Sequence, residues 1–239
     1  MKPARFIALV LVAALNASSG VLAQTAARFE VTSIKAIRPT LLNTIAALQK
    51  RDVAAARDAF EAYDSGWNGI EVYINFRYPE MYKELEGGYQ ARIAKGLSAA
   101  NVDTAGLLAE AKAMLAKFDE EVAQIEKAPP IGRLFDDVAR LRIERAHLRE
   151  VTPAIKAGKP AKARTSFQAF NDNWDSIEDL VRERSRDAYV AIESGMIEIE
   201  KALMPAQPDA DKLIGLVSDV MNRYNAIVSE ITKEARSAK

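Results

Sequence analysis

Cysteine is absent from the 239-residue chain, and histidine occurs once, at His147. Without thiols the protein can form neither disulfides nor thiolate metal sites, and it cannot carry a covalently attached c-type haem. A single histidine also argues against a ferritin-like di-iron centre, in which Glu-x-x-His motifs supply imidazole ligands. Any metal site in this chain is therefore expected to use oxygen ligands.

Neither sign of charge predominates, because 33 basic residues balance 33 acidic ones. No dense basic cluster of the kind that binds phosphates stands out along the chain, so a nucleic-acid partner is not expected. A serine nucleophile elbow and a phosphate-binding loop are also missing. We therefore expect a non-catalytic protein, and the one activity left open is oxidation of iron at a carboxylate-bridged centre.

Long hydrophobic runs are missing too, apart from a short apolar stretch at residues 6–14. This stretch follows Lys2 and Arg5 and precedes small residues that end at Ala23, which is the layout of a secretory signal peptide. It is shorter than the roughly 18 to 20 apolar residues of a membrane-spanning helix. We therefore expect a periplasmic or secreted protein that does not span a membrane.

The rest of the chain is rich in Ala, Leu, Glu, Lys and Arg, with apolar residues three and four positions apart, which predicts helices throughout. Pro129 and Pro130 separate the helices into two groups, because two successive prolines cannot continue a helix. The third helix begins at residue 79 and is expected to end near either residue 88 or residue 96. The other expected helices cover residues 31–49, 52–76, 104–127, 132–157, 160–183, 186–203 and 209–236.

One set of four residues occurs twice, with a shift of 107 positions. The first copy is Trp67, Glu71, Tyr82 and Glu86, and the second is Trp174, Glu178, Tyr189 and Glu193. Ungapped alignment of residues 41–86 with residues 148–193 adds nine identical pairs, among them Phe60 with Phe167. The last helices of the two units align after a one-residue deletion, with Phe118 opposite Tyr224. Such self-similarity predicts a duplicated unit.

We therefore expect an all-α protein of two pseudo-symmetric repeats, each a bundle of about four antiparallel helices. The signal peptide would cover residues 1–23, the first repeat residues 24–128 and the second repeat residues 129–239.

The spacing further predicts that two glutamates face each other in each repeat. Glu71 and Glu86 are equidistant from the helix break at residues 78 and 79, so an antiparallel hairpin places them at the same height. Tyr82 lies one turn from Glu86. The same arithmetic around residues 185 and 186 applies to Glu178, Tyr189 and Glu193.

Carboxylates held this close repel each other unless they share a cation or a proton. Sites made only of oxygen suit hard cations such as iron(III), manganese, calcium or magnesium, and a tyrosine phenolate favours iron(III). Iron is thus the expected cofactor. The expected ligands are Glu71, Tyr82, Glu86, Glu178, Tyr189 and Glu193.

Arginines also recur with the 107-residue shift, and they support a second interpretation of the glutamates as strongly as the spacing supports a metal site. They could pair with the glutamates as buried salt bridges, which would leave a structural network and no metal. These arginines are Arg38 with Arg145, Arg57 with Arg164, and Arg77 with Arg184.

Two further groups are expected to be structural. Trp67 and Trp174 are expected to fill the core. The acidic run of Asp119, Glu120 and Glu121 is expected on a solvated helix face.

The segments YDSGWNGIE (residues 63–71) and YKELE (residues 82–86) resemble the repeated helical periplasmic extension of some bacterial high-affinity iron permeases. In those extensions an aromatic residue precedes one glutamate, and a second glutamate follows on the next helix. The resemblance covers residues 60–86 and 167–193 and implies a stand-alone periplasmic partner in iron handling. The matching positions are Glu71, Glu86, Glu178 and Glu193. The permease membrane helices have no counterpart here, so the resemblance does not extend to transport itself.

Three functions are consistent with these features. The first is an exported metal-binding protein that acts as a carrier or accessory in metal uptake, with an inner-membrane metal permease or another envelope protein as its partner. The second is a helical scaffold of the cell envelope, in which the Arg and Glu pairs are structural. The third is a sensor that binds a small organic ligand between Trp67 and Trp174.

Overall fold

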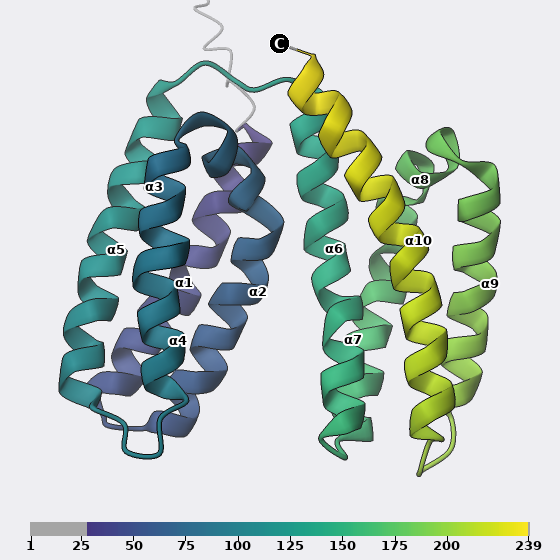
Figure 1. The fold of residues 1–239 in the computed structure, drawn as a ribbon, viewed down its shortest axis with the longest axis horizontal. Coiled ribbons are helices and arrows are strands. Elements are labelled where there is room, and N and C mark those ends of the chain that lie inside the picture. The colour runs from purple at the N-terminus through teal and green to yellow at the C-terminus, as the bar shows by residue number, and fades with distance from the viewer. Residues whose placement is uncertain (1–27, 239) are drawn as a thin grey trace, which may run out of the picture.

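The computed structural model describes residues 28–238, so the expected signal peptide at residues 1–23 lies outside the described part (Figure 1). Within residues 28–238 the protein is helical and contains no strand, which confirms the prediction of an all-α helical bundle. The elements are α1 (Phe29–Gln49), α2 (Val53–Arg77), α3 (Pro79–Lys83), η1 (Glu84–Gln90), α4 (Ala91–Leu97), α5 (Thr104–Lys127), α6 (Arg133–Lys156), α7 (Pro160–Asn173), η2 (Trp174–Ser176), α8 (Glu178–Arg184), α9 (Arg186–Leu203) and α10 (Ala210–Ser237).

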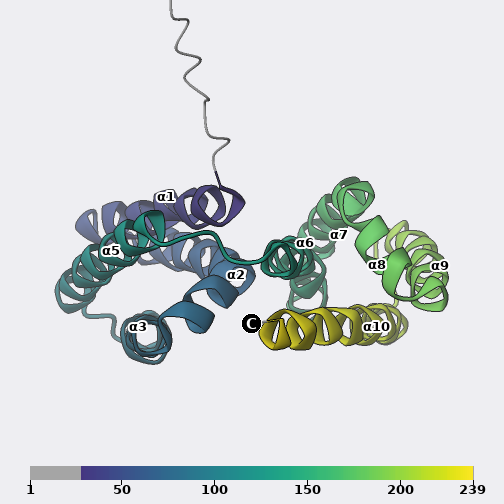
Figure 2. The ribbon, with the colours of Figure 1, turned by 90° about the horizontal axis from the view of Figure 1, so that it is seen from above.

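These elements form two bundles that lie side by side (Figures 1 and 2). In the first bundle α1 packs against α2 and α5, and the run of α3, η1 and α4 closes the bundle between α2 and α5. The second bundle has the same order, with α6 in contact with α7 and α10, and α9 between them. Residues 128–132, which include Pro129 and Pro130, connect the two bundles.

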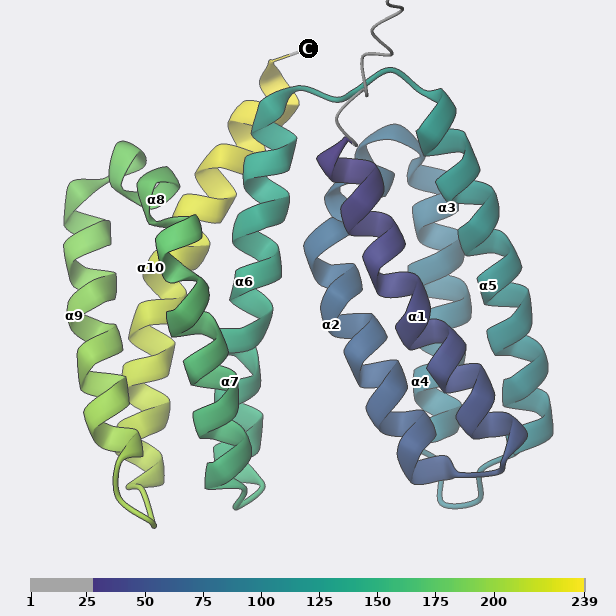
Figure 3. The same ribbon diagram turned by 180° about the vertical axis from the view of Figure 1, so that it is seen from behind.

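Helices α2 and α6 form the contact between the bundles (Figure 3). Tyr73 Oη donates a hydrogen bond to Asp136 Oδ1 across this contact at 2.7 Å. Gly69 permits the close approach, because a Cβ atom there would lie 2.6 Å from Ile143 Cγ1 and 3.2 Å from the Ile143 backbone. The bundles are therefore joined by helix packing as well as by the linker.

Polar side chains start several helices at the residues where the sequence predicts a start. Asp52 Oδ1 accepts a hydrogen bond from the Ala55 N–H at 3.0 Å, and Asp103 Oδ1 accepts one from the Gly106 N–H at 3.0 Å. Each contact satisfies a backbone donor that the first helical turn leaves free. Among residues 28–238, no helix is both long and apolar enough to cross a bilayer.

The third helical run of the first bundle is one residue longer than its counterpart α9. The extra residue is accommodated in η1 (Glu84–Gln90), which is a π-helix, whereas α9 is α-helical throughout. A π-helix closes its hydrogen bonds over one more residue than an α-helix, so it can absorb an insertion without ending the helix. The one-residue offset between the two units in sequence thus coincides with a local change of helix type.

The expectation of one continuous helix over residues 160–183 is wrong. Helix α7 ends at Asn173, a 3₁₀ turn covers Trp174–Ser176, and α8 begins at Glu178. Ser176 Oγ donates a hydrogen bond to the Asn173 carbonyl oxygen at 2.7 Å. Local bonds of this kind compete with the helical pattern, and this stretch is rich in Asn, Asp and Ser.

Candidate functional site

The recurring side chains of the first bundle meet between α2 and the run of α3 and η1. Trp67 Nε1 donates a hydrogen bond to Glu86 Oε2 at 3.0 Å. The Trp67 and Tyr82 rings stack with their centroids 6.4 Å apart and an interplanar angle of 9°. Trp67 is 1% exposed, so its ring fills the core, as expected, while its N–H orients the carboxylate.

Glu71 and Glu86 lie close enough to interact directly, as their positions around the helix break predict. Burial and the neighbouring Glu86 carboxylate raise the pKa of Glu71 to about 7, although Arg142 acts in the opposite direction. Burial also acts to raise the pKa of Glu86, but hydrogen bonds from Trp67 and Tyr82 outweigh it and hold this pKa below its ordinary value. Of the two carboxylates, Glu71 therefore takes up a proton more readily, and Glu86 keeps its negative charge to lower pH.

Arg142 of the second bundle already interacts with this carboxylate pair. Its Nη1 atom donates to Glu71 Oε1 at 2.7 Å, and both side chains are 16% exposed. The contact runs from α6 to α2 and so crosses the interface between the bundles. In the first copy a salt bridge therefore neutralises one of the two glutamates.

The second bundle builds the same arrangement from its own copy of the set. Trp174 Nε1 donates to Glu193 Oε1 at 3.4 Å, and the Trp174 and Tyr189 rings stack with centroids 6.3 Å apart at 17°. Tyr189 Oη donates to Glu178 Oε2 at 3.4 Å. A hydrogen bond with Glu193 also raises the pKa of Tyr189, so the phenol interacts with both carboxylates.

The second copy is the more accessible one. Its arginine is Arg182, which lies one turn along α8 from Glu178 with an N–O distance of 3.6 Å and is 49% exposed. An exposed pair of this kind contributes little stability and separates easily. Glu178 can therefore exchange Arg182 for another cation at a lower cost than Glu71 can exchange Arg142.

The three recurring arginine pairs do not contact the four repeated glutamates. The expectation that these arginines pair with those glutamates as buried salt bridges is therefore wrong. Arg57 Nε and Arg164 Nε each donate at 2.7 Å to the last carbonyl of a neighbouring helix, at Leu97 and Leu203 respectively. Such contacts satisfy carbonyls that a helix end leaves free.

The other recurring arginines also bind elsewhere. Arg38 forms two hydrogen bonds with Asp119, at 2.7 and 2.8 Å, and Arg145 donates to Asn225 Oδ1 at 3.0 Å. Arg77 and Arg184 bind Glu30 and Glu234. The arginines that do meet the glutamates, Arg142 and Arg182, are not equivalent positions in the two units.

Each copy thus presents two carboxylates and a phenol, which are donors that hard cations accept. Among the described residues no group of three or more acidic or imidazole side chains is placed to hold a metal ion. A cation at either copy would therefore need the tyrosine oxygen, or ligands from solvent, in addition to the two carboxylates.

Trp67 and Trp174 belong to different bundles, and each stacks on its own tyrosine. They therefore do not face each other across a shared core.

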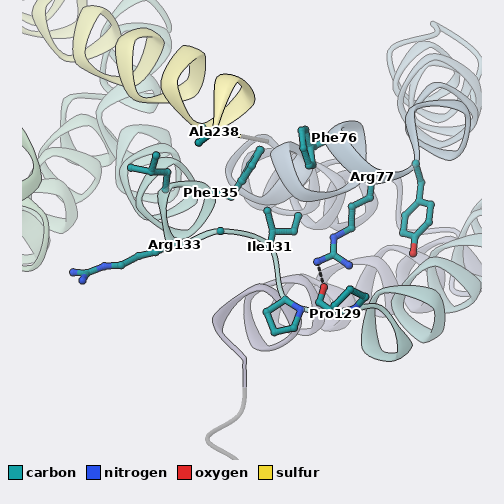
Figure 4. A pocket seen from close by; sticks show the side chains of 12 residues that line it. Phe76, Arg77, Pro129, Ile131, Arg133, Phe135 and Ala238 are labelled. Carbon is teal, nitrogen blue, oxygen red and sulfur yellow. Dashed lines mark hydrogen bonds between the residues drawn. The ribbon is translucent and has the colours of Figure 1, made fainter.

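An apolar pocket of about 630 Å³ lies instead where the linker meets both bundles, lined by residues such as Phe76, Ile131 and Phe135 (Figure 4). Arg77 donates a hydrogen bond to the Pro129 carbonyl oxygen in its wall. None of the six expected metal ligands lines this pocket.

Glu121 contradicts the expectation of a solvated acidic run. Its side chain is 0% exposed, and neither carboxyl oxygen has a hydrogen-bond partner among residues 28–238. Tyr63 Oη and Gln90 Nε2 of the same bundle are also buried, and neither has a hydrogen-bond partner in the described part of the chain. The signal in the sequence is periodicity, because Glu121 shares the inward stripe of Phe118 and Ile125 on α5.

Burial raises the pKa of Glu121 to about 8, and the nearby carboxylates of Glu84 and Glu120 act in the same direction. The second bundle has apolar, buried side chains at the three matching positions. These are Phe170, Met196 and Ile227. A buried polar group without a partner costs stability, so the first bundle carries a penalty that the second avoids.

Searches against family models, curated proteins and solved structures find no match to this chain. The resemblance to the permease extensions therefore stays a prediction.

Proposed function

We propose that the protein binds a hard metal cation through the duplicated glutamates and tyrosines, with the second copy as the exchangeable site. The observation that carries this proposal is the repetition of one hydrogen-bonded arrangement in both bundles. In each, a buried tryptophan orients one carboxylate, and a tyrosine stacks on that tryptophan. A core position alone does not require an indole N–H aimed at a carboxylate.

The chemistry of the second copy suits capture and release of a cation. Glu178 and Glu193 supply negative charge, and the Tyr189 hydroxyl interacts with both of them. Trp174 holds Glu193 in place, so part of the site is ordered before a cation binds. Arg182 lies 3.6 Å from Glu178 and also pairs with Asp179, so it keeps a carboxylate partner when a cation replaces it at Glu178.

Iron is the cation we propose, because a tyrosine oxygen beside two carboxylates suits a hard, strongly polarising ion. A carrier or an accessory in metal uptake at the cell envelope is the corresponding role, and an inner-membrane metal permease is the proposed partner. Export to the periplasm rests on the layout of residues 1–23.

A scaffold is the second candidate function, and the Arg142–Glu71 contact favours it for the first copy. This salt bridge and the Tyr73–Asp136 hydrogen bond both join α2 to α6. Removing one partner of a buried ion pair is costly, so the first copy stabilises the joint between the bundles rather than exchanging cations.

Titration with iron(III) citrate, manganese(II), calcium and terbium(III) tests the metal proposal in purified protein without residues 1–23. Terbium luminescence excited through tryptophan reports a hard cation near Trp174. We expect Glu178→Gln/Glu193→Gln to lose binding by tenfold or more, and Glu71→Gln/Glu86→Gln to retain one site.

Glu198→Gln is the matched control, because this exposed glutamate of α9 forms its salt bridge with Lys201 and lies outside the repeated set. Equal binding by the wild type and the Glu178/Glu193 variant would refute the proposal. Equal loss in both double variants would instead place a single site across the two bundles.

A further inference from the structure

A polar pocket of about 510 Å³ lies between α6 and α10 on the second bundle. Four basic side chains line it, Arg142 and Arg145 from α6, and Lys233 and Arg236 from α10. Each pair is three residues apart, so both members point from the same face of their helix. The two pairs are far apart in sequence, and only the packing of α10 on α6 brings them together.

These positive charges are poorly compensated. Arg142 is the one member of the four with a carboxylate partner among residues 28–238, and that partner, Glu71, lies on the other bundle. The Nε atoms of Arg142 and Arg145 are buried and have no hydrogen-bond partner in the described part of the chain. Burial and repulsion from Arg142 lower the pKa of Arg145.

The matching face of the first bundle has carboxylates that the pocket of the second bundle lacks. There Lys35 pairs with Glu126, and Arg38 pairs with Asp119, so two cations meet two carboxylates. The second bundle keeps both cations as Arg142 and Arg145. It replaces the carboxylates with neutral residues at the aligned positions, which are Asn225 and Thr232.

We propose that this pocket binds a small multivalent oxyanion of the phosphate-ester or polycarboxylate class. A guanidinium group can donate two parallel hydrogen bonds to a carboxylate or phosphate, and Arg145 and Arg236 line the pocket from opposite helices. Asn225 and Thr232 can add neutral hydrogen bonds. The pocket volume accommodates a molecule larger than inorganic phosphate.

The pocket is separate from the proposed cation site on α8 and α9, so the two proposals succeed or fail independently. They share no ligand, although Arg142 contacts both the pocket and Glu71 of the first copy. An anion that binds Arg142 is expected to weaken its hold on Glu71, because one guanidinium then serves two acceptors.

Calorimetry and thermal unfolding with inorganic phosphate, glycerol phosphate and citrate test this proposal, with sodium chloride at equal ionic strength as the reference. The decisive variant is Asn225→Asp/Thr232→Glu, which restores the carboxylates of the first bundle. We expect it to fold at least as well as the wild type and to bind the anions at least tenfold more weakly, because its own carboxylates occupy Arg142 and Arg145.

Arg38→Gln is the matched control on the first bundle, and it is expected to leave anion binding unchanged. Citrate binding without phosphate binding, or the reverse, identifies the class of ligand within the proposal. Two outcomes would overturn it. One is a response to none of the three anions beyond that to chloride, and the other is an equal response in the wild type and the Asn225→Asp/Thr232→Glu variant.

Discussion

Glu121 places a carboxyl group where the second bundle has Ile227, and the two environments are equally buried. The carboxyl group is tolerated because it can hold a proton, which removes the charge that burial penalises. Its pKa of about 8 lies above the ordinary value of 4.5. The stability of the fold must therefore depend on pH at this residue.

We predict that Glu121→Gln changes the pH dependence of unfolding. A carboxyl group whose pKa is raised on folding contributes most below the unfolded value, and this contribution is lost as the pH rises through about 8. The free energy of unfolding of the wild type should fall between pH 5 and pH 8 by on the order of 3 kcal/mol more than that of Glu121→Gln.

Urea unfolding at both pH values measures this difference. Glu120→Gln, on the exposed neighbour, should keep most of the wild-type pH dependence, because burial contributes more to the raised pKa of Glu121 than the Glu120 carboxylate does. Parallel curves for the wild type and Glu121→Gln would show that the carboxyl group is solvated in the native protein.

The π-helix η1 lies in the helical run where the first bundle has one more residue than the second. Glu86 and Gln90 both belong to η1, so this irregular segment positions side chains of the carboxylate pair and of the buried polar cluster. A wider helical turn is costly, and π-helices are frequent at functional sites.

We predict that deletion of Gly87 is tolerated and converts η1 into regular α-helix. A Cβ atom at residue 87 would meet nothing within 4 Å, and the deletion restores the register found in α9. The thermal midpoint should change by a few degrees at most, for a free-energy change of about 1 kcal/mol. Circular dichroism during heating measures the midpoint.

Deletion of Ala111 is the contrasting variant, because this buried residue lies inside the regular helix α5. It rotates every following side chain away from the core and is expected to unfold the first bundle. Similar loss of structure in both variants would mean that η1 is required by the packing around it.

Helices α2 and α6 determine whether the two bundles behave as one unit. The contact combines a salt bridge, a hydrogen bond and the close approach at Gly69. Because Gly69 faces the Ile143 backbone as well as its side chain, an added methyl group cannot be accommodated by a rotamer change alone.

We predict that Gly69→Ala destabilises the protein by about 1 to 3 kcal/mol and weakens the coupling between the bundles. Scanning calorimetry should show a broader transition or two transitions in place of one. Gly215→Ala is the matched control, because a Cβ atom at this helical position of α10 meets nothing within 4 Å. It should gain about 0.5 to 1 kcal/mol. A stabilised Gly69→Ala variant would contradict the close packing of α2 on α6.

Much of the fold can be predicted from local patterns. Asp52 and Asp103 identify helix starts, and prolines and apolar spacing identify most helix bounds, because caps and periodicity act over a few residues. The meeting of Glu71 with Glu86 follows from their equal distance to one break. The breaks at η1 and η2 do not follow, because the packing around a segment decides whether an irregular turn is retained.

Composition, spacing and self-similarity are enough to predict the helical class of the protein and to identify the twofold set of Trp, Glu, Tyr and Glu. The partner of each charge, in contrast, depends on how the helices pack. Arg142 meets Glu71, Arg57 meets a helix end, and Arg145 meets an amide where Arg38 meets a carboxylate. The reason is physical: a charged side chain interacts with whatever packing brings within a few ångströms, and those groups come from helices distant in the chain.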